Sequence, residues 1–61
     1  MKITLTQENS NDKIYEVKTD SPVTPEAVES MAEVQEFIQG KNFEIQGDME
    51  DPQVFWITVS A

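Results

Sequence analysis

Apolar and polar residues alternate in three short stretches of this 61-residue chain, and this period of two predicts half-buried β-strands. The first two stretches are residues 2–6 and 13–19, and the segment between them is rich in Asn, Asp and Ser. Two strands joined by a short polar loop predict a β-hairpin. The residues expected to face the core from this hairpin are Ile3, Leu5, Tyr15 and Val17.

A period of three to four residues replaces the alternation in the next segment and predicts an amphipathic helix. Thr24 can cap its N-terminus, and Pro25 suits the first helical position, where its missing N–H costs nothing. Gly40 suits the left-handed residue that often ends a helix. We therefore expect one helix from Pro25 to about Gln39. Its apolar stripe consists of Ala27, Met31, Val34 and Ile38, flanked by Val28 and Phe37.

The third alternating stretch, residues 43–46, predicts another strand, which is followed by a loop over residues 47–53 and a last strand over residues 54–59. The resulting order, ββαββ, predicts a single α+β domain over residues 1–61. Its four-stranded sheet carries one helix packed on one face. A crossover that joins parallel strands in this sheet would be right-handed.

The last strand is apolar on both faces, which leaves its register open. In one register, the side chains that face the core are Phe55, Ile57 and Val59. Those that face outward are then Val54, Trp56 and Thr58. A shift of one residue would turn Trp56 into the core and Phe55 outward, because side chains alternate along a strand.

The order of elements resembles the β-grasp fold, in particular the small bacterial immunoglobulin-binding domains. The run Thr24-Pro25-Glu26-Ala27-Val28 is similar to the helix start of those domains, and the lengths nearly match. The tryptophan departs from their pattern, because Trp56 lies in the last strand instead of the third. The helix also lacks their mixed lysine surface. The resemblance therefore implies the fold and not immunoglobulin binding.

Composition adds an unbalanced negative charge, since twelve Asp and Glu stand against four Lys, with no Arg and no His, for a formal net charge of −8. Without Cys or His there are no disulfides and no thiolate or imidazole metal sites, so neither a metal nor a cofactor is expected.

The chain begins with alternation instead of the apolar block of a signal peptide, and its longest apolar run is far too short to cross a bilayer. Nucleic acid and anionic membranes would repel such a chain. We therefore expect a cytoplasmic protein that binds neither directly.

The sequence contains few of the residue types that enzymes use for catalysis. No His or Cys is present to form a nucleophile–base pair, and no Gly-rich loop is present to hold a phosphate. Paired carboxylates could hydrolyse glycosides, but so small a domain has scant room for a substrate cleft. We expect no catalytic residues and no enzyme.

The predicted helix carries glutamates on its outer face. Glu29, Glu33 and Glu36 fall within about 60° of one another around the axis, and Glu26 lies at the edge. Like charges at these spacings destabilise a helix by a few tenths of a kcal/mol, and no helical Lys compensates them. An ordinary solvated face also carries Glu, but usually with both signs mixed. The single sign favours a surface that meets a positive partner.

A second acidic group occupies the last loop. Asp48, Glu50 and Asp51 lie there, with Glu44 nearby. Their order lacks the alternating oxygen ligands, the glycine and the distal Glu of a calcium-binding EF-hand loop. Two interpretations stay open: a solvated turn, or a second patch of the same acidic surface.

The sheet face away from the helix is expected to be less acidic. It would carry Ile14, Val54 and Trp56 among Thr4, Thr6, Lys18 and Gln46. Tryptophan is enriched at interfaces, and a domain of this size buries only about 60% of its unfolded surface. A homodimer or partner interface on this face is one interpretation, and the shifted register of the last strand is the other.

Size, charge and the absence of Cys together resemble the DNA-mimicking host-takeover proteins of bacteriophages, among them the phage inhibitor of the bacterial nucleoid protein HU. The residues that carry the resemblance are Glu26, Glu29, Glu33, Glu36, Asp48, Glu50 and Asp51. It implies competitive occlusion inside a host bacterial cell, in which carboxylates occupy the basic surface where phosphates would lie. The alternative is a β-grasp-like interaction module that inhibits host RNA polymerase or another machine through Trp56. A third interpretation is an assembly protein that acts by self-association alone.

Overall fold

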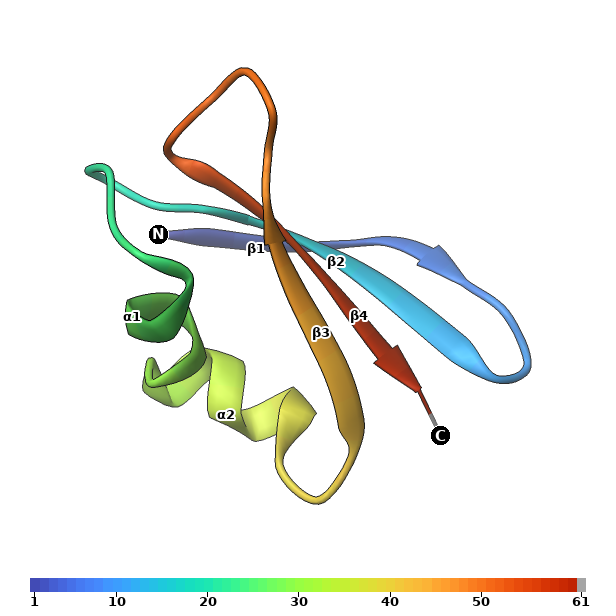
Figure 1. Cartoon of the computed structure of the whole chain (residues 1–61). Coiled ribbons are helices and arrows are strands. Elements are labelled where there is room, and N and C mark those ends of the chain that lie inside the picture. Colours follow the sequence, from blue (N-terminus) through green and yellow to red (C-terminus); the bar gives the residue numbers. More distant parts are fainter. Residues whose placement is uncertain (61) are drawn as a thin grey trace.

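Four strands and two short helices make up the part of the chain that the computed structural model describes, residues 1–60 (Figure 1). In chain order they are β1 (Lys2–Glu8), β2 (Asp12–Lys18), α1 (Pro25–Glu29), α2 (Ala32–Ile38), β3 (Asn42–Gly47) and β4 (Val54–Ser60). The sheet order is β1-β2-β4-β3, and each neighbouring pair is antiparallel. The predicted α+β class and ββαββ order are confirmed. The helical crossover joins β2 to β3, which run parallel on either side of β4 because each is antiparallel to it, so the condition for a right-handed crossover is met.

The predicted single helix is wrong in one respect, because it is divided at residues 30–31. Thr24 caps α1 as expected, with its Oγ1 accepting from the Ala27 N–H at 3.2 Å. Ser30 ends α1 by donating its hydroxyl to the Ala27 carbonyl at 2.9 Å, which competes with helix continuation. Met31 is then extended, with φ −67° and ψ 137°.

The division of the helix has a packing cause. Val28 and Val34 are both 0% exposed, but in one straight helix they would point about 120° apart around the axis. Re-orienting α2 after Met31 lets both valines reach the core. The Glu29 carbonyl, which a continuous helix would use, accepts instead from the Gln35 side chain at 2.7 Å.

The prediction of a left-handed residue at Gly40 is confirmed, but the motif is a turn beyond the helix. Gln39 has φ −63° and ψ 128°, and Gly40 has φ 74°. The Lys41 N–H bonds to the Ile38 carbonyl at 3.1 Å. These angles and this bond define a type II β-turn, in which the third residue must tolerate positive φ.

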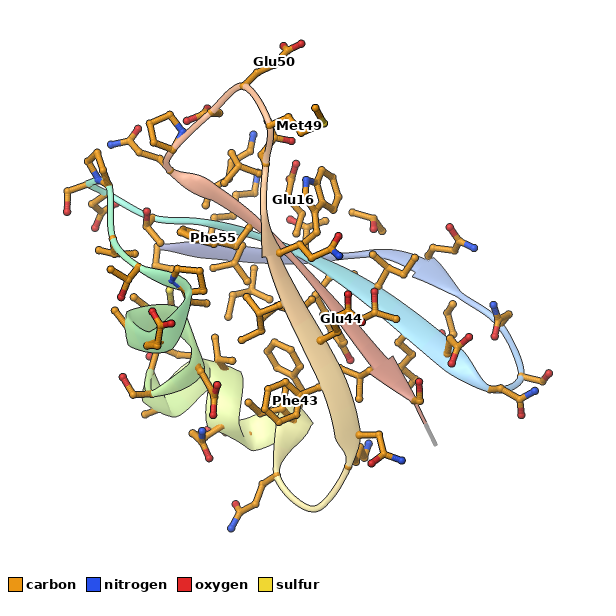
Figure 2. All side chains as sticks on the ribbon, in the orientation of Figure 1. Glu16, Phe43, Glu44, Met49, Glu50 and Phe55 are labelled. Carbon is orange, nitrogen blue, oxygen red and sulfur yellow. The ribbon has the colours of Figure 1, made fainter. Side chains whose placement is uncertain are left out.

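The core lies between the helices and one face of the sheet, and it confirms the first register of the last strand. Phe55, Ile57 and Val59 are 3%, 0% and 5% exposed. Figure 2 shows Phe55 and Phe43 on the helix side of the sheet. The alternative in which Trp56 enters the core is therefore wrong. The other members of the core cluster are Val17, Val28, Val34 and Ile38.

The helices cover this sheet face unevenly. Tyr15 stacks on Phe37 with ring centroids 4.1 Å apart, but Leu5 on the edge strand β1 remains 45% exposed. After Leu5 the register shifts by one residue, a β-bulge in which the Thr6 hydroxyl bonds to the Ile14 carbonyl at 3.0 Å. The bulge brings Glu8 opposite Lys13, and the two form an ion pair at 3.5 Å.

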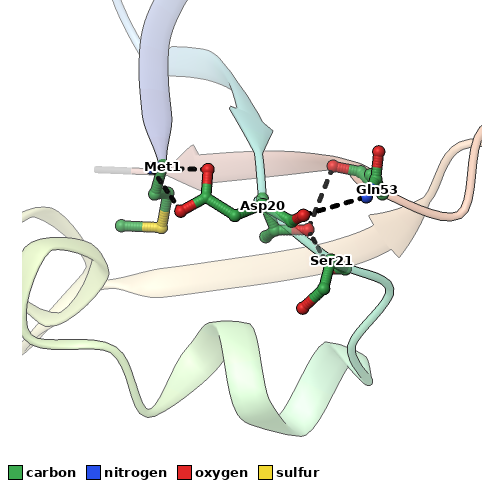
Figure 3. A network of polar contacts seen from close by, with 5 residues as sticks. Met1, Asp20, Ser21 and Gln53 are labelled. Carbon is green, nitrogen blue, oxygen red and sulfur yellow. Dashed lines mark hydrogen bonds and ion pairs between the residues drawn. The ribbon is translucent and has the colours of Figure 1, made fainter.

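Polar contacts fix the β3–β4 loop to the segment after β2 (Figure 3). The Thr19 N–H donates to the Gln53 carbonyl at 2.8 Å, and the Gln53 amide donates to the Asp20 carbonyl at 3.2 Å. The amino terminus of Met1 lies 3.3 Å from an Asp20 carboxylate oxygen. Two segments far apart in sequence are thereby held together at one end of the sheet.

Candidate partner-binding site

Most of the acidic side chains have no positive neighbour. All twelve lie within residues 1–60, none is buried, and only Glu8 and Asp20 form ion pairs in this part of the chain. Ten carboxylates are thus left without an ion-pair partner among the described residues. Water screens them, so the fold tolerates their mutual repulsion.

The charge is unevenly divided along the chain and in space. Residues 1–20 hold four carboxylates and three lysines, whereas residues 21–61 hold eight carboxylates against Lys41 alone, a net side-chain charge of −7. The first segment forms the β1–β2 side of the sheet, and the second forms the helices, β3 and the β3–β4 loop (Figure 1). The negative charge therefore gathers on the β3 side.

The four helical glutamates are all exposed, as expected, but they belong to two helices. Glu26 and Glu29 are three residues apart on α1, and Glu33 and Glu36 are three residues apart on α2. The division of the helix removes the predicted single ridge and replaces it with two like-charge pairs.

The acidic loop is partly a structural element. Asp48 Oδ2 accepts the N–H groups of Glu50 and Asp51 at 3.0 and 3.1 Å, and Asp51 Oδ1 accepts that of Gln53 at 2.9 Å. Glu50, by contrast, points away from the sheet at the loop tip (Figure 2). Asp48 and Asp51 therefore order the turn, and Glu50 is left exposed at its tip. That the loop is a second patch of the acidic surface stays a prediction.

Trp56 lies on the uncovered face of the sheet, as the first register predicts, and Asp48 fixes its orientation. The indole Nε1 donates to Asp48 Oδ1 at 3.0 Å. This bond, followed by those from the Glu50 and Asp51 amides, holds the pKa of the Asp48 carboxyl below its ordinary value of 3.8. The indole N–H is thus used internally, and the ring stays partly exposed.

This face carries carboxylates that the sequence analysis did not place beside Trp56. Glu16 on β2 and Gln46 on β3 are the direct cross-strand neighbours of Trp56. Gln46 donates to the Glu44 carboxylate at 2.7 Å, and Asp48 bonds to the indole itself. Figure 2 shows Glu16 and Glu44 on the side of the sheet away from α2. The remaining predicted face residues are Ile14, partly exposed, and Val54, 8% exposed.

The structure does not bring the predicted acidic residues into one patch. The helical glutamates lie on one side of the sheet, and Glu44 and Asp48 border Trp56 on the other. Sequence reasoning missed Glu16 as a neighbour of Trp56, and it missed Met49, which is 100% exposed beside Asp48.

Other kinds of site find little support in residues 1–60. No group of three or more His, Cys, Asp or Glu is placed there to hold a metal ion. An open depression of about 220 Å³ lies at the β1–β2 turn, lined in part by Lys13 and Lys41, away from Trp56. No helix in the described part is long and apolar enough to cross a membrane.

Comparisons with known proteins give no assignment: no family model, no curated protein and no solved structure matches this chain. The chemistry of the surface is therefore the basis for a function. It offers carboxylates on both sides of a small sheet and one oriented aromatic ring, a combination suited to binding positive charge.

Proposed function

We propose that this protein is an acidic DNA mimic that binds the basic DNA-binding surface of a host protein, for which the bacterial nucleoid protein HU is the best candidate, and blocks DNA binding. It acts in the cytoplasm of the host cell. The observation that carries the proposal is the set of ten carboxylates without an ion-pair partner among residues 1–60.

The shape of the molecule supports this role. The principal-axis extents of the Cα trace are 32 × 21 × 16 Å, an elongated body similar in width to a DNA duplex. Carboxylates lie on the helix side and on the Trp56 side of this thin body, as phosphates lie on all sides of DNA. A protein that clasps DNA between basic surfaces could contact both sides. Charge steering would also speed the encounter at low salt.

A competition experiment tests the proposal. The protein is titrated into a complex of HU with labelled duplex DNA, and free DNA is measured by mobility shift at about 50 mM and about 200 mM salt. We expect displacement of the DNA, together with direct binding to HU that weakens as salt rises. No displacement and no binding to HU or another basic DNA-binding protein at low salt would refute the proposal.

Two charge-matched triple variants locate the contact. In the first, Glu29, Glu33 and Glu36 become Gln. In the second, Glu8 becomes Gln and Asp12 and Asp20 become Asn, which gives the same change in charge on the β1–β2 side. We expect the first variant to lose several-fold more inhibition than the second, since its acids lie on the β3 side. Equal inhibition by both would mean that the helical acids contribute no more than those on the β1–β2 side, and wild-type inhibition by the first would mean that they take no part.

A second candidate function rests on the exposed ring. Trp56 stays partly exposed on a sheet face that no helix covers, which favours an interaction module that inhibits RNA polymerase or a similar machine. Such binding would depend on apolar area and would change little with salt, so the same salt series separates the two functions. A self-associating assembly protein would instead form an oligomer in ultracentrifugation and bind no basic partner.

A further inference from the structure

The sheet face that no helix covers offers a partner an aromatic ring whose polar group is already occupied. The Trp56 N–H is bonded to Asp48 and the side chain is partly exposed, so a partner would meet the carbon surface of the ring instead of its N–H group. Aromatic faces attract cations, and the carboxylate at the ring edge adds negative charge beside them. Among the described residues no lysine makes a cation–π contact with this ring.

Carboxylates lie on both sides of the ring. Glu16 is its direct neighbour on β2, and Glu44 lies diagonally from it on β3, held by the Gln46 amide. Since β2 and β3 flank β4, their backbones are about 10 Å apart, two strand spacings. That width admits one planar side chain above the indole, with a carboxylate on each side.

Two further side chains lie close to the ring. Met49, fully exposed next to Asp48, offers apolar surface at the loop end of the ring. Lys18 lies diagonally on β2, opposite Val54, and is the one lysine beside the ring among the described residues. The carboxylates therefore outnumber the cation around Trp56, and the face complements a positive side chain.

We propose that an arginine of the basic partner stacks on Trp56 with its guanidinium between Glu16 and Glu44. This inference rests on the proposed function and names one point of contact, on the Trp56 side of the sheet. Arginine fits better than lysine because its planar group stacks on an aromatic face while its N–H groups bond to carboxylates at the edges. A lysine ammonium is a compact, strongly hydrated charge that gains less from the ring.

The single tryptophan makes the inference directly measurable. Trp56 is the only tryptophan in the chain, so its fluorescence reports on this face alone. The wild-type protein is titrated with octa-arginine and with octa-lysine at low salt. We expect octa-arginine to change the emission and to bind about two- to fivefold more tightly than octa-lysine, the ratio that a surface cation–π contact supplies.

Matched double variants provide the control. We expect Glu16→Gln with Glu44→Gln to weaken octa-arginine binding about fivefold, as two exposed ion pairs would. Glu33→Gln with Glu36→Gln makes the same change in charge on the helix side and should weaken it by less than about twofold. In Trp56→Leu, followed by calorimetry, the preference for arginine over lysine should disappear.

Unchanged emission, equal affinity for the two peptides, or equal losses in the two double variants would each overturn the inference. The proposed function would survive such a result if the protein still displaced DNA from HU in the mobility shift. Failure of the protein to bind any basic partner would refute the function itself. If Trp56→Leu does not fold, the two double variants still decide between these outcomes.

Discussion

The two glycines of the chain should respond in opposite directions to the same substitution. Gly40 has φ 74°, and no atom lies within 4 Å of the place that a Cβ would take. At Gly47 a Cβ would meet only Phe55 Cε2, at an ordinary 3.9 Å. Neither alanine therefore clashes, and the difference between them is one of backbone conformation.

The magnitudes follow from this geometry. A left-handed conformation costs a residue with a Cβ about 1–2 kcal/mol, and alanine recovers about 0.4–1 kcal/mol by restricting the unfolded chain. Gly40→Ala should thus lower the free energy of unfolding by about 1 kcal/mol, which is about 4–8 °C in Tm for a domain of this size. Gly47→Ala carries no left-handed penalty and should raise stability by about 0.4–1 kcal/mol.

Urea and thermal unfolding, followed by Trp56 fluorescence and circular dichroism, measure both variants. Gly40→Asn provides a control, because asparagine tolerates the left-handed region and should lose less than alanine. A Gly40→Ala variant as stable as Gly47→Ala would refute the type II turn after α2.

Three further predictions concern the charges and the core. Glu33→Gln with Glu36→Gln should raise stability by a few tenths of a kcal/mol, because it removes one like-charge pair from α2, and this gain should shrink as salt rises in urea unfolding. Asp48→Asn should lower Tm at neutral pH, because the folded state holds the pKa of Asp48 below 3.8. The difference from wild type should start to shrink as pH falls below 3.8 and should be lost once pH passes through the lower pKa of the folded state, where the wild-type carboxyl becomes protonated. Ile57→Ala should cost about 2–5 kcal/mol, a large part of the roughly 3–9 kcal/mol that a chain of this length supplies, whereas Ile57→Val should cost only about 0.5–1.5 kcal/mol in the same assay.

The strands and their inward faces were predictable from sequence because alternation is a local property. Tyr15 and Val17 face the core as their pattern requires, and the pattern of β4 narrowed the choice to two registers. The break in the helix was not predictable from its apolar stripe. It follows from the need to bury both Val28 and Val34, which depends on how the helices meet the sheet.

The candidate site was predictable only in part, for a related reason. The exposure of the helical glutamates and the outward position of Trp56 follow from local periods. The placement of Glu16 beside Trp56 depends on the register of β2 against β4, two strands far apart in the sequence. Asp48 was expected to belong to the acidic surface, but its bonds to the indole and the loop amides make it a structural residue first.

The residues that stabilise the fold are different from the residues that bear the charge, and this explains how so small a domain tolerates a net charge of −8. The core cluster is wholly apolar and comes from β2, β4 and the helices, and no charged side chain is buried among residues 1–60. The acids occupy exposed or partly exposed positions, where water screens them and each like-charge pair costs only tenths of a kcal/mol. Substitution of a residue that is retained for folding lowers the free energy of unfolding of the domain. Neutralising the unpaired glutamates should instead raise the stability of the domain and weaken its binding to the partner. That is the pattern of residues retained for binding.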